Sequence, residues 1–219
     1  RVMSELFCNI GLSKVPYPYI HHGVDIKEFD KETYAAECRL ANPQLIIVGR
    51  IEKFKGHFYL IDALPRIVAA CKGVKLLVLG EGSQTENCMK WATERGVADH
   101  VRFLGFKAHP YSYISHSDVI VLPSLFEPFG LVYIEAFALK IPVVAFDTPA
   151  GNEIMEHNKT ALLSARGDSA QLADQIIYLL QNPAERFRIA ESASEVYKER
   201  FTTKVMIRKT AEWYLSLGK

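Results

Sequence analysis

The chain has 219 residues, 49% of them hydrophobic and 23% charged, which is typical of one soluble globular domain and a fraction of another. Its 26 Lys and Arg residues are balanced by 25 Asp and Glu residues, which argues against a nucleic-acid or membrane-surface binder driven by bulk charge. No apolar run exceeds five residues, far short of the roughly 20 that span a bilayer. Four cysteines without a C-x-x-C pair favour buried thiols and a cytoplasmic location, and the first residue, Arg1, suggests a piece of a longer protein.

Residues 1–40 do not share the pattern of the rest and are predicted to be a linker with a remnant of a preceding domain. From residue 41 onward, short buried strands alternate with amphipathic helices. Strands are predicted at 45–48, 74–79, 101–104, 119–122 and 141–146. Helices are predicted at 60–71 with a kink at Pro65, at 83–96 with Ser83 as its cap and Gly96 as its stop, and at 110–116, 130–139, 168–181, 184–200 and 203–217.

This alternation predicts an α/β fold with a doubly wound parallel sheet, because strands joined through helices pair in parallel by right-handed crossovers. Such sheets bind ligands outside the carboxyl ends of their strands, near the point where the strand order reverses. The loops that follow the predicted strands are therefore expected to carry the chemistry.

The loop at 49–56 is the first candidate for an anion site. Arg50 offers a planar fork for phosphate oxygens, Lys55 offers a point charge, and the start of the next helix adds free N–H groups. Taken alone, two such cations are more often solvated surface residues.

The loop at 80–82 reads Gly-Glu-Gly, but Thr85 stands where a dinucleotide fingerprint has its third glycine, so a nicotinamide or flavin enzyme is disfavoured.

The loop at 123–136 contains two carboxylates, Glu127 and Glu135, on either side of a predicted helix start near Gly130. Retaining glycosidases need their carboxyl groups roughly 5 Å apart, whereas eight helical residues would span about 12 Å. The pair is therefore interpreted as binding two separate parts of one extended ligand. An ordinary helix with one solvated and one capping Glu is the alternative.

The order and spacing of these motifs resemble the nucleotide-sugar half of a family-4 retaining glycosyltransferase with the GT-B fold. The resemblance covers about residue 15 to the end. It rests on Gly49-Arg50 with Lys55-Gly56, Gly80-Glu81-Gly82, Pro123-Ser124 followed by Glu127-Pro128-Phe129-Gly130-Leu131 and Glu135-Ala136, Pro142-Val143-Val144, and Gly151-Asn152-Glu153. Residues 22–25 with Phe29 resemble the family's hinge, with His22 in place of the usual Asn.

The resemblance implies a role for each matching residue, with no cofactor and no metal. The catalytic residues would be Arg50, Lys55 and Glu127. Arg50 and Lys55 would neutralise the donor diphosphate, and Glu127 would form hydrogen bonds with hydroxyls of the donor sugar. Glu135 would hold the ribose hydroxyls. The remaining donor-binding residues would be the strand-end glycines Gly49 and Gly80, the base-lining Phe106 and Lys107, and Phe129, Gly130 and Leu131, whose N–H groups would meet the phosphates.

The same resemblance implies a donor-binding domain at 41–202 and a helix at 203–219 that crosses to an absent N-terminal acceptor domain. In isolation that helix should expose apolar side chains, and the fragment should bind a UDP- or GDP-sugar but transfer its hexose poorly. The full-length enzyme is expected in the cytoplasm, with peripheral association to the inner face of a membrane. A sugar-nucleotide epimerase, a phosphorylase and a non-catalytic nucleotide-binding module are the alternatives.

Lys140 stands where the family has Gly, so a left-handed lysine is expected there.

Overall fold

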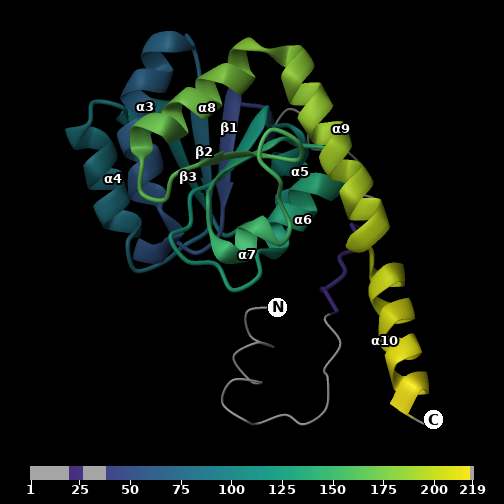
Figure 1. Ribbon diagram of the computed structural model, residues 1–219. Coiled ribbons are helices and arrows are strands. Elements are labelled where there is room, and N and C mark those ends of the chain that lie inside the picture. Colours follow the sequence, from purple (N-terminus) through teal and green to yellow (C-terminus); the bar gives the residue numbers. More distant parts are fainter. Residues whose placement is uncertain (1–19, 27–37, 218–219) are drawn as a thin grey trace.

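A computed structural model describes residues 20–26 and 38–217, and the hinge prediction at Phe29 lies outside them. Their centre is a six-stranded sheet in the order β3-β2-β1-β4-β5-β6, with every neighbouring pair parallel (Figure 1). The order reverses between β1 and β4, which is the arrangement of a doubly wound sheet. The strands are β1 (Gln44–Val48), β2 (Lys75–Leu79), β3 (Val101–Gly105), β4 (Val119–Leu122), β5 (Val143–Phe146) and β6 (Leu162–Ser164).

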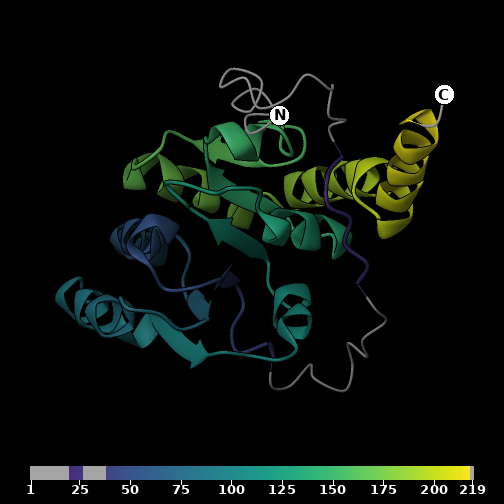
Figure 2. The same ribbon diagram turned by 90° about the horizontal axis from the view of Figure 1, so that it is seen from below.

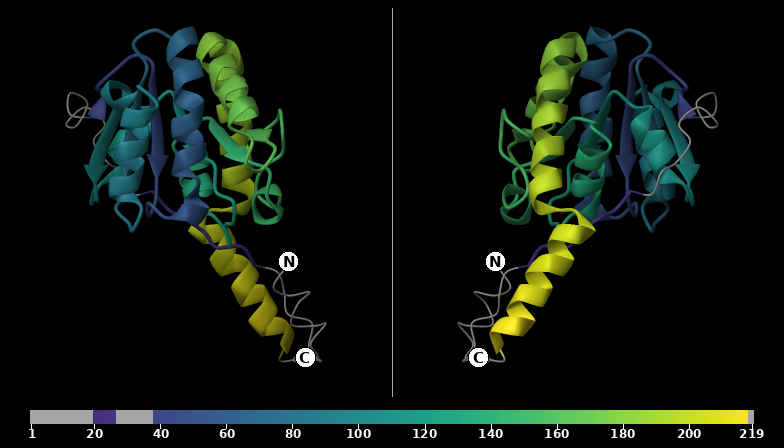
Figure 3. Two further views of the ribbon diagram at one scale, coloured as in Figure 1. Left: turned by 90° about the vertical axis from the view of Figure 1, so that its left-hand side faces the viewer. Right: turned by 90° about the vertical axis from the view of Figure 1, so that its right-hand side faces the viewer.

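Helices cover both faces of this sheet (Figure 3), because successive side chains of a strand point to opposite faces. On β1, Leu45 and Ile47 pack with α3, α4 and α8, whereas Ile46 packs with α5, α6 and the second half of α9. The helices are α3 (His57–Ala70), α4 (Thr85–Glu94), α5 (Pro110–Ser115), α6 (Leu131–Ala138), α7 (Pro149–Asn152), α8 (Ser169–Gln181), α9 (Pro183–Arg200) and α10 (Thr203–Leu217), with two short 3-10 helices, η1 (Lys53–Lys55) and η2 (Ala98–His100).

The structure confirms the five predicted strands and the predicted fold class, and it corrects two local predictions. The edge strand β6 was not predicted, because three residues are too short to show a periodic pattern. Ser83 does not cap α4: its hydroxyl donates to the Glu52 carboxylate at 2.7 Å, and the residue before the helix is Gln84. The helix at Pro65 continues to Ala70 as one element.

Two predicted backbone features are confirmed. Gly96 follows α4 with a φ of 68°, as expected of a helix stop. Lys140 has a φ of 57°, so the left-handed lysine is present, and its Nζ lies 2.8 Å from Glu191 Oε1.

The helix α10 leaves the body on the side where the strands end, and it extends away from the rest of the molecule (Figures 1 and 3). The segment at 20–26 lies against its base, where Val24 N–H donates to Phe201 O at 2.9 Å. Three large apolar side chains of α10 face solvent: Ile207 is 59% exposed, Tyr214 63% and Leu215 74%. The predicted apolar exposure of this helix is therefore confirmed. No helix in the described ranges is long and apolar enough to cross a membrane.

Candidate functional site

The loops that carry the predicted motifs meet at the carboxyl edge of the sheet, which Figure 2 views from below. Two cavities at this edge lie on either side of Val48 at the end of β1, and a third lies at the ends of β5 and β6. Of the two cavities beside Val48, we call the wider one, which extends toward β2 and β3, the open cavity. We call the smaller and less exposed one, which lies toward β4, the enclosed cavity. Eight of the eleven predicted site residues line one of the cavities beside Val48, whereas Phe129, Leu131 and Glu135 line neither.

The open cavity has a volume of about 410 Å³. Its floor consists of consecutive strand ends, since Gly49 N–H donates to Leu79 O and Gly80 N–H donates to Gly105 O, each at 2.9 Å. A Cβ at Gly80 would overlap the carbonyl oxygen of Gly49, and the φ of Gly80 is 131°, so only glycine fits. A Cβ at Gly49 would meet no atom within 4 Å, so the space beside Gly49 is open and a ligand can approach its backbone closely.

Side chains form the rim of the open cavity. Arg50 is exposed and its guanidinium carbon lies 5.9 Å from the centre of the Phe54 ring. Phe106 is 76% exposed, and Lys107 Nζ lies 5.8 Å from the centre of the Tyr113 ring. An apolar ring and two cations around a glycine floor suit a flat, partly anionic ligand.

The enclosed cavity lies beneath an ion pair that joins two of the predicted loops. Lys55 Nζ is 2.6 Å from Glu127 Oε2, with side chains that are 22% and 13% exposed. Gly56 has a φ of 77°, and any Cβ there would overlap the carbonyl oxygen of Pro123. Leu125 N–H also donates to Phe54 O at 2.8 Å. The two loops are thus fixed to each other, and the ion pair has a defined position.

The helix α6 begins at Leu131, four residues after Glu127, at the same edge. Gly130, with a φ of 86°, is its N-cap, and a Cβ there would overlap the Tyr133 ring. The first N–H groups of a helix have no partner within the helix, so this end favours an anion. Leu131 is 46% exposed, and the Phe129 ring lies 5.2 Å from the ring of His22 in the hinge segment.

Glu135 lies one turn further along α6 and is held by a residue of α5. Tyr111 Oη donates to Glu135 Oε1 at 3.2 Å. Burial raises the pKa of Glu135, and the bond from Tyr111 opposes that rise. Burial and the nearby Glu135 charge raise the pKa of Tyr111 to about 12, so its hydroxyl remains a donor at neutral pH. Pro110, next to Tyr111, lines the open cavity.

The structure therefore groups the predicted site residues differently from their order in the sequence. Lys55, Glu127 and Gly130 line the enclosed cavity, whereas Arg50 lines the open one. Gly49, Gly80, Phe106 and Lys107 also line the open cavity. Within residues 20–26 and 38–217, no three His, Cys, Asp or Glu side chains gather where they could hold a metal ion.

Three polar residues of the site were not predicted from the sequence: His57, Tyr111 and Tyr133. His57 directly follows the Lys55-Gly56 motif, and Tyr133 stands two residues before Glu135. Their positions next to predicted motifs were the only signal. Periodicity alone places each of them on a helix without showing that its polar atoms face a cavity.

The profile of the glycosyl transferases group 1 family matches residues 30–196. The alpha-D-kanosaminyltransferase of Streptomyces kanamyceticus is 29% identical over 199 residues, which are 88% of this chain and 52% of that protein. The glycogen synthase of Mycobacterium tuberculosis is 32% identical over 217 residues, which are 98% of this chain and 51% of that protein. The chain thus spans about half the length of the curated relatives it matches.

A solved structure agrees with these sequence matches. The crystal structure of Anabaena Alr3699/HepE in complex with UDP and glucose superposes with a TM-score of 0.86 at 25% identity, and the match covers 97% of this chain and 60% of that chain. Both comparisons confirm that the motifs are those of a group 1 glycosyltransferase.

Proposed function

Because the chain belongs to the glycosyl transferases group 1 family, we propose that it is the nucleotide-sugar-binding half of a retaining, metal-independent glycosyltransferase. The full-length enzyme would move a hexose from a UDP- or GDP-sugar to a glycan, lipid or small-molecule acceptor. The observation that carries this proposal is the Lys55–Glu127 ion pair beside the 410 Å³ glycine-floored cavity, at the point where the strand order reverses. No observation favours an epimerase or a non-catalytic module.

The two cavities supply the charges that breaking a sugar–phosphate bond requires. Positive charge develops on the sugar and negative charge on the departing diphosphate. Arg50, Lys55 and the start of α6 would stabilise the diphosphate, which is why a divalent cation is not needed. Glu127 would bond hydroxyls of the sugar, and a phosphate oxygen would help to deprotonate the acceptor on the same face of the ring.

The nucleoside would occupy the open cavity. Phe106 and Lys107 at its rim would line the base, and Glu135 would hold the ribose hydroxyls from α6. The glycine floor of Gly49 and Gly80 would let the nucleotide lie against the backbone.

Transfer itself would need an acceptor domain, since the chain spans about half the length of its relatives. The exposed apolar side chains Ile207, Tyr214 and Leu215 would pack on that domain, which α10 would reach by crossing from residues 41–202. Location in the cytoplasm and peripheral association with a membrane belong to the same proposal for the full-length enzyme.

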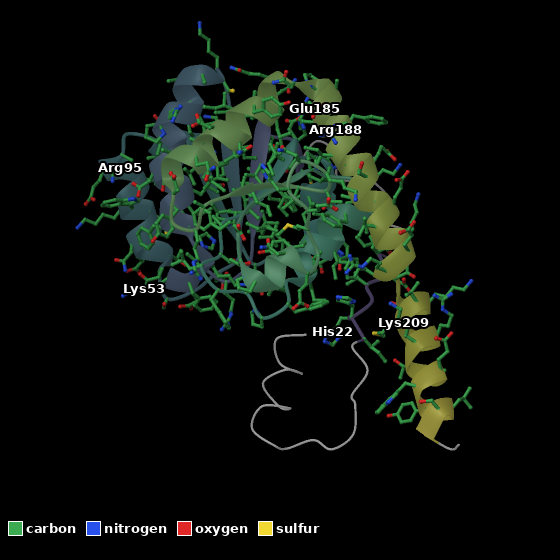
Figure 4. All side chains as sticks on the ribbon, viewed as in Figure 1. His22, Lys53, Arg95, Glu185, Arg188 and Lys209 are labelled. Carbon is green, nitrogen blue, oxygen red and sulfur yellow. The ribbon has the colours of Figure 1, made fainter. Side chains whose placement is uncertain are left out.

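Calorimetric titration of this chain with UDP and GDP, in EDTA and again with Mg²⁺, tests the proposal. We expect one nucleotide to bind without metal, and we expect Lys55→Met or Arg50→Ala to weaken its affinity at least about tenfold, as loss of a charge-assisted contact does. Lys53→Met is the matched control, because Lys53 is an exposed cation of η1 that extends from the lower edge of the body (Figure 4). Binding only with Mg²⁺ would contradict metal independence, and no binding of either nucleotide would contradict the donor site.

A further inference from the structure

The enclosed cavity beneath the Lys55–Glu127 ion pair contains buried polar groups that the proposed donor site does not use. Its volume is about 20 Å³, and its lining includes His57 from the start of α3 and Tyr133 from α6. His57 is 3% exposed and Tyr133 is 1% exposed. Both side chains are therefore removed from bulk solvent.

Three polar atoms of these two side chains have no hydrogen-bond partner in the described part of the chain: His57 Nδ1, His57 Nε2 and Tyr133 Oη. Buried polar groups in folded proteins are almost always hydrogen-bonded, to protein or to ordered water, because an unpaired group costs folding free energy. Both side chains line the same cavity, so one small molecule in it can pair with the Tyr133 hydroxyl and with one of the two His57 nitrogens.

The size and chemistry of the cavity identify that partner. A site needs about 10–15 Å³ of volume to hold one water molecule, together with two to four polar partners. The cavity meets both conditions, and it is too small for a sugar or a phosphate. An apolar cavity of this size would stay dry, but this one has an imidazole, a phenol and an ion pair on its walls.

The two side chains also interact electrostatically with the ion pair. Burial, and then the Lys55 charge, lower the pKa of His57 to about 4, so the imidazole is neutral at pH 7 and has one donor and one acceptor nitrogen. Burial, and then the Glu127 charge, raise the pKa of Tyr133, so its hydroxyl stays protonated. A water molecule can accept from the Tyr133 hydroxyl and donate to the His57 acceptor nitrogen.

We propose that the enclosed cavity binds one water molecule that links His57 and Tyr133 beneath the Lys55–Glu127 ion pair. His57 and Tyr133 are then positioning residues, which hold Glu127 at a fixed place without touching the donor. The water site stands on the cavity and its lining alone. Its effect on sugar binding rests on the proposed function.

A double-mutant cycle tests the water site without any ligand. If one water bridges the two side chains, His57→Leu and Tyr133→Phe each lower the urea midpoint at pH 7.5, and the double variant loses no more than the larger single loss, because either substitution already breaks the bridge. If the polar atoms are independent and unpaired, each substitution leaves or raises the midpoint and the effects add. Tyr133→Phe, which keeps the ring, decides the question by itself if His57→Leu does not fold.

A high-resolution crystal structure of the chain gives a second, direct reading. An electron-density peak within hydrogen-bond distance of Tyr133 Oη and a His57 ring nitrogen supports the proposal. A cavity without such a peak overturns it, whatever the chain binds.

The positioning role has its own measurement. Calorimetry with UDP and UDP-glucose, or with GDP and GDP-mannose where the guanosine nucleotide binds more tightly, separates contacts to the sugar from contacts to the nucleotide. We expect Tyr133→Phe to weaken the nucleotide sugar about fivefold more than the nucleotide alone, which is the effect of one hydrogen bond. Tyr178→Phe, on the exposed side of α8, should change neither affinity. Equal effects on both ligands would overturn the positioning role, and failure of both to bind would instead reject the proposed function.

Discussion

The two cavities on either side of Val48 differ in what forms their walls. The enclosed cavity has the charged and polar side chains of Lys55, His57, Glu127 and Tyr133 beside aliphatic ones, whereas the open cavity has a floor of strand-end backbone. The enclosed cavity therefore depends on hydrogen bonds and charge, which respond to pH and to conservative substitution. The open cavity depends on glycines at positions that disfavour a side chain, so a substitution there cannot be offset by a new polar contact.

The comparison also explains why the open cavity and the ion pair of the enclosed cavity can serve one ligand. A nucleobase and ribose need a wide, shallow surface, whereas a sugar that changes its charge during reaction needs fixed electrostatic partners. The ion pair supplies those partners, and the interlocked loops at Gly56 and Pro123 hold them. Backbone shape and side-chain charge can then be tested separately.

The largest expected effect is at the floor of the open cavity. Gly80→Ala should lower the free energy of unfolding by at least about 3 kcal/mol, because the new Cβ overlaps the Gly49 carbonyl oxygen. Gly49→Ala is the matched control: Gly49 has a similar φ of 146°, but its Cβ would meet no atom within 4 Å. We expect only the backbone strain of about 1–2 kcal/mol there. Urea unfolding of both variants measures the difference, and equal losses would show that strain rather than overlap governs the floor.

The enclosed cavity should show its dependence on charge as acid sensitivity. The pKa of His57 is about 4 in the folded chain and about 6.5 when unfolded, so between these values the unfolded state binds more protons. The stability contributed by neutral His57 is full above pH 6.5, and about 3 kcal/mol of it is lost as the pH falls to 4. Protonation is opposed by burial and by Lys55, while Glu127 and Tyr133 face the same cavity.

Urea unfolding from pH 7.5 to 4 measures this loss as a difference between variants, since His21 also has a pKa lowered to about 4 by burial. His57→Leu should lose less stability over this range than the parent chain. Tyr133→Phe should retain the parent's acid sensitivity, because a phenol does not titrate there. If His57→Leu and the parent chain were equally sensitive to acid, the His57 imidazole would not be a buried group that is neutral in the folded chain.

A smaller effect is expected at the hydrogen bond that joins α5 to α6. Tyr111→Phe removes the hydrogen bond to Glu135 at a cost of about 1 kcal/mol of folding stability. If Glu135 holds the ribose, the variant should weaken UDP or GDP by about threefold and leave the 2′-deoxy nucleotide unchanged. Calorimetry with both nucleotides measures this. Equal weakening of both would mean that Tyr111 acts on the cavity as a whole.

The sequence predicted the parts of this comparison that depend on local patterns. Five of the six strands, the left-handed Lys140 and the loops that carry the site follow from hydrophobic runs, glycines and motif order. The strand β6 was missed because Leu162–Ser164 has only three residues and is a strand through its pairing with β5. The predicted capping role of Ser83 was wrong because its hydroxyl donates to the carboxylate of Glu52, 31 residues earlier in the chain.

The division of the site into two cavities could not be predicted from the sequence. Arg50 and Lys55 are five residues apart in one loop, yet they line different cavities because η1 turns the chain between them. The burial of His57 and Tyr133 depends on two loops, after β1 and β4, that meet only in the folded sheet. Tertiary contacts of this kind leave no periodic signal in either segment.

The smallest expected effect lies outside both cavities and calibrates the strain assigned to the glycine floor. Lys140→Gly should stabilise the chain by about 0.5–1 kcal/mol, because glycine adopts a φ of 57° without the cost that a side chain adds, and the exposed ion pair with Glu191 contributes little. Lys140→Ala keeps the strain and removes the same ion pair, so urea unfolding of the two variants isolates the backbone term. A gain equal to the Gly49→Ala loss would show that positive φ has the same cost on the surface and at the cavity floor. Since nothing lies within 4 Å of a Cβ at Gly49, any larger loss there would instead come from the altered path of the chain into Arg50.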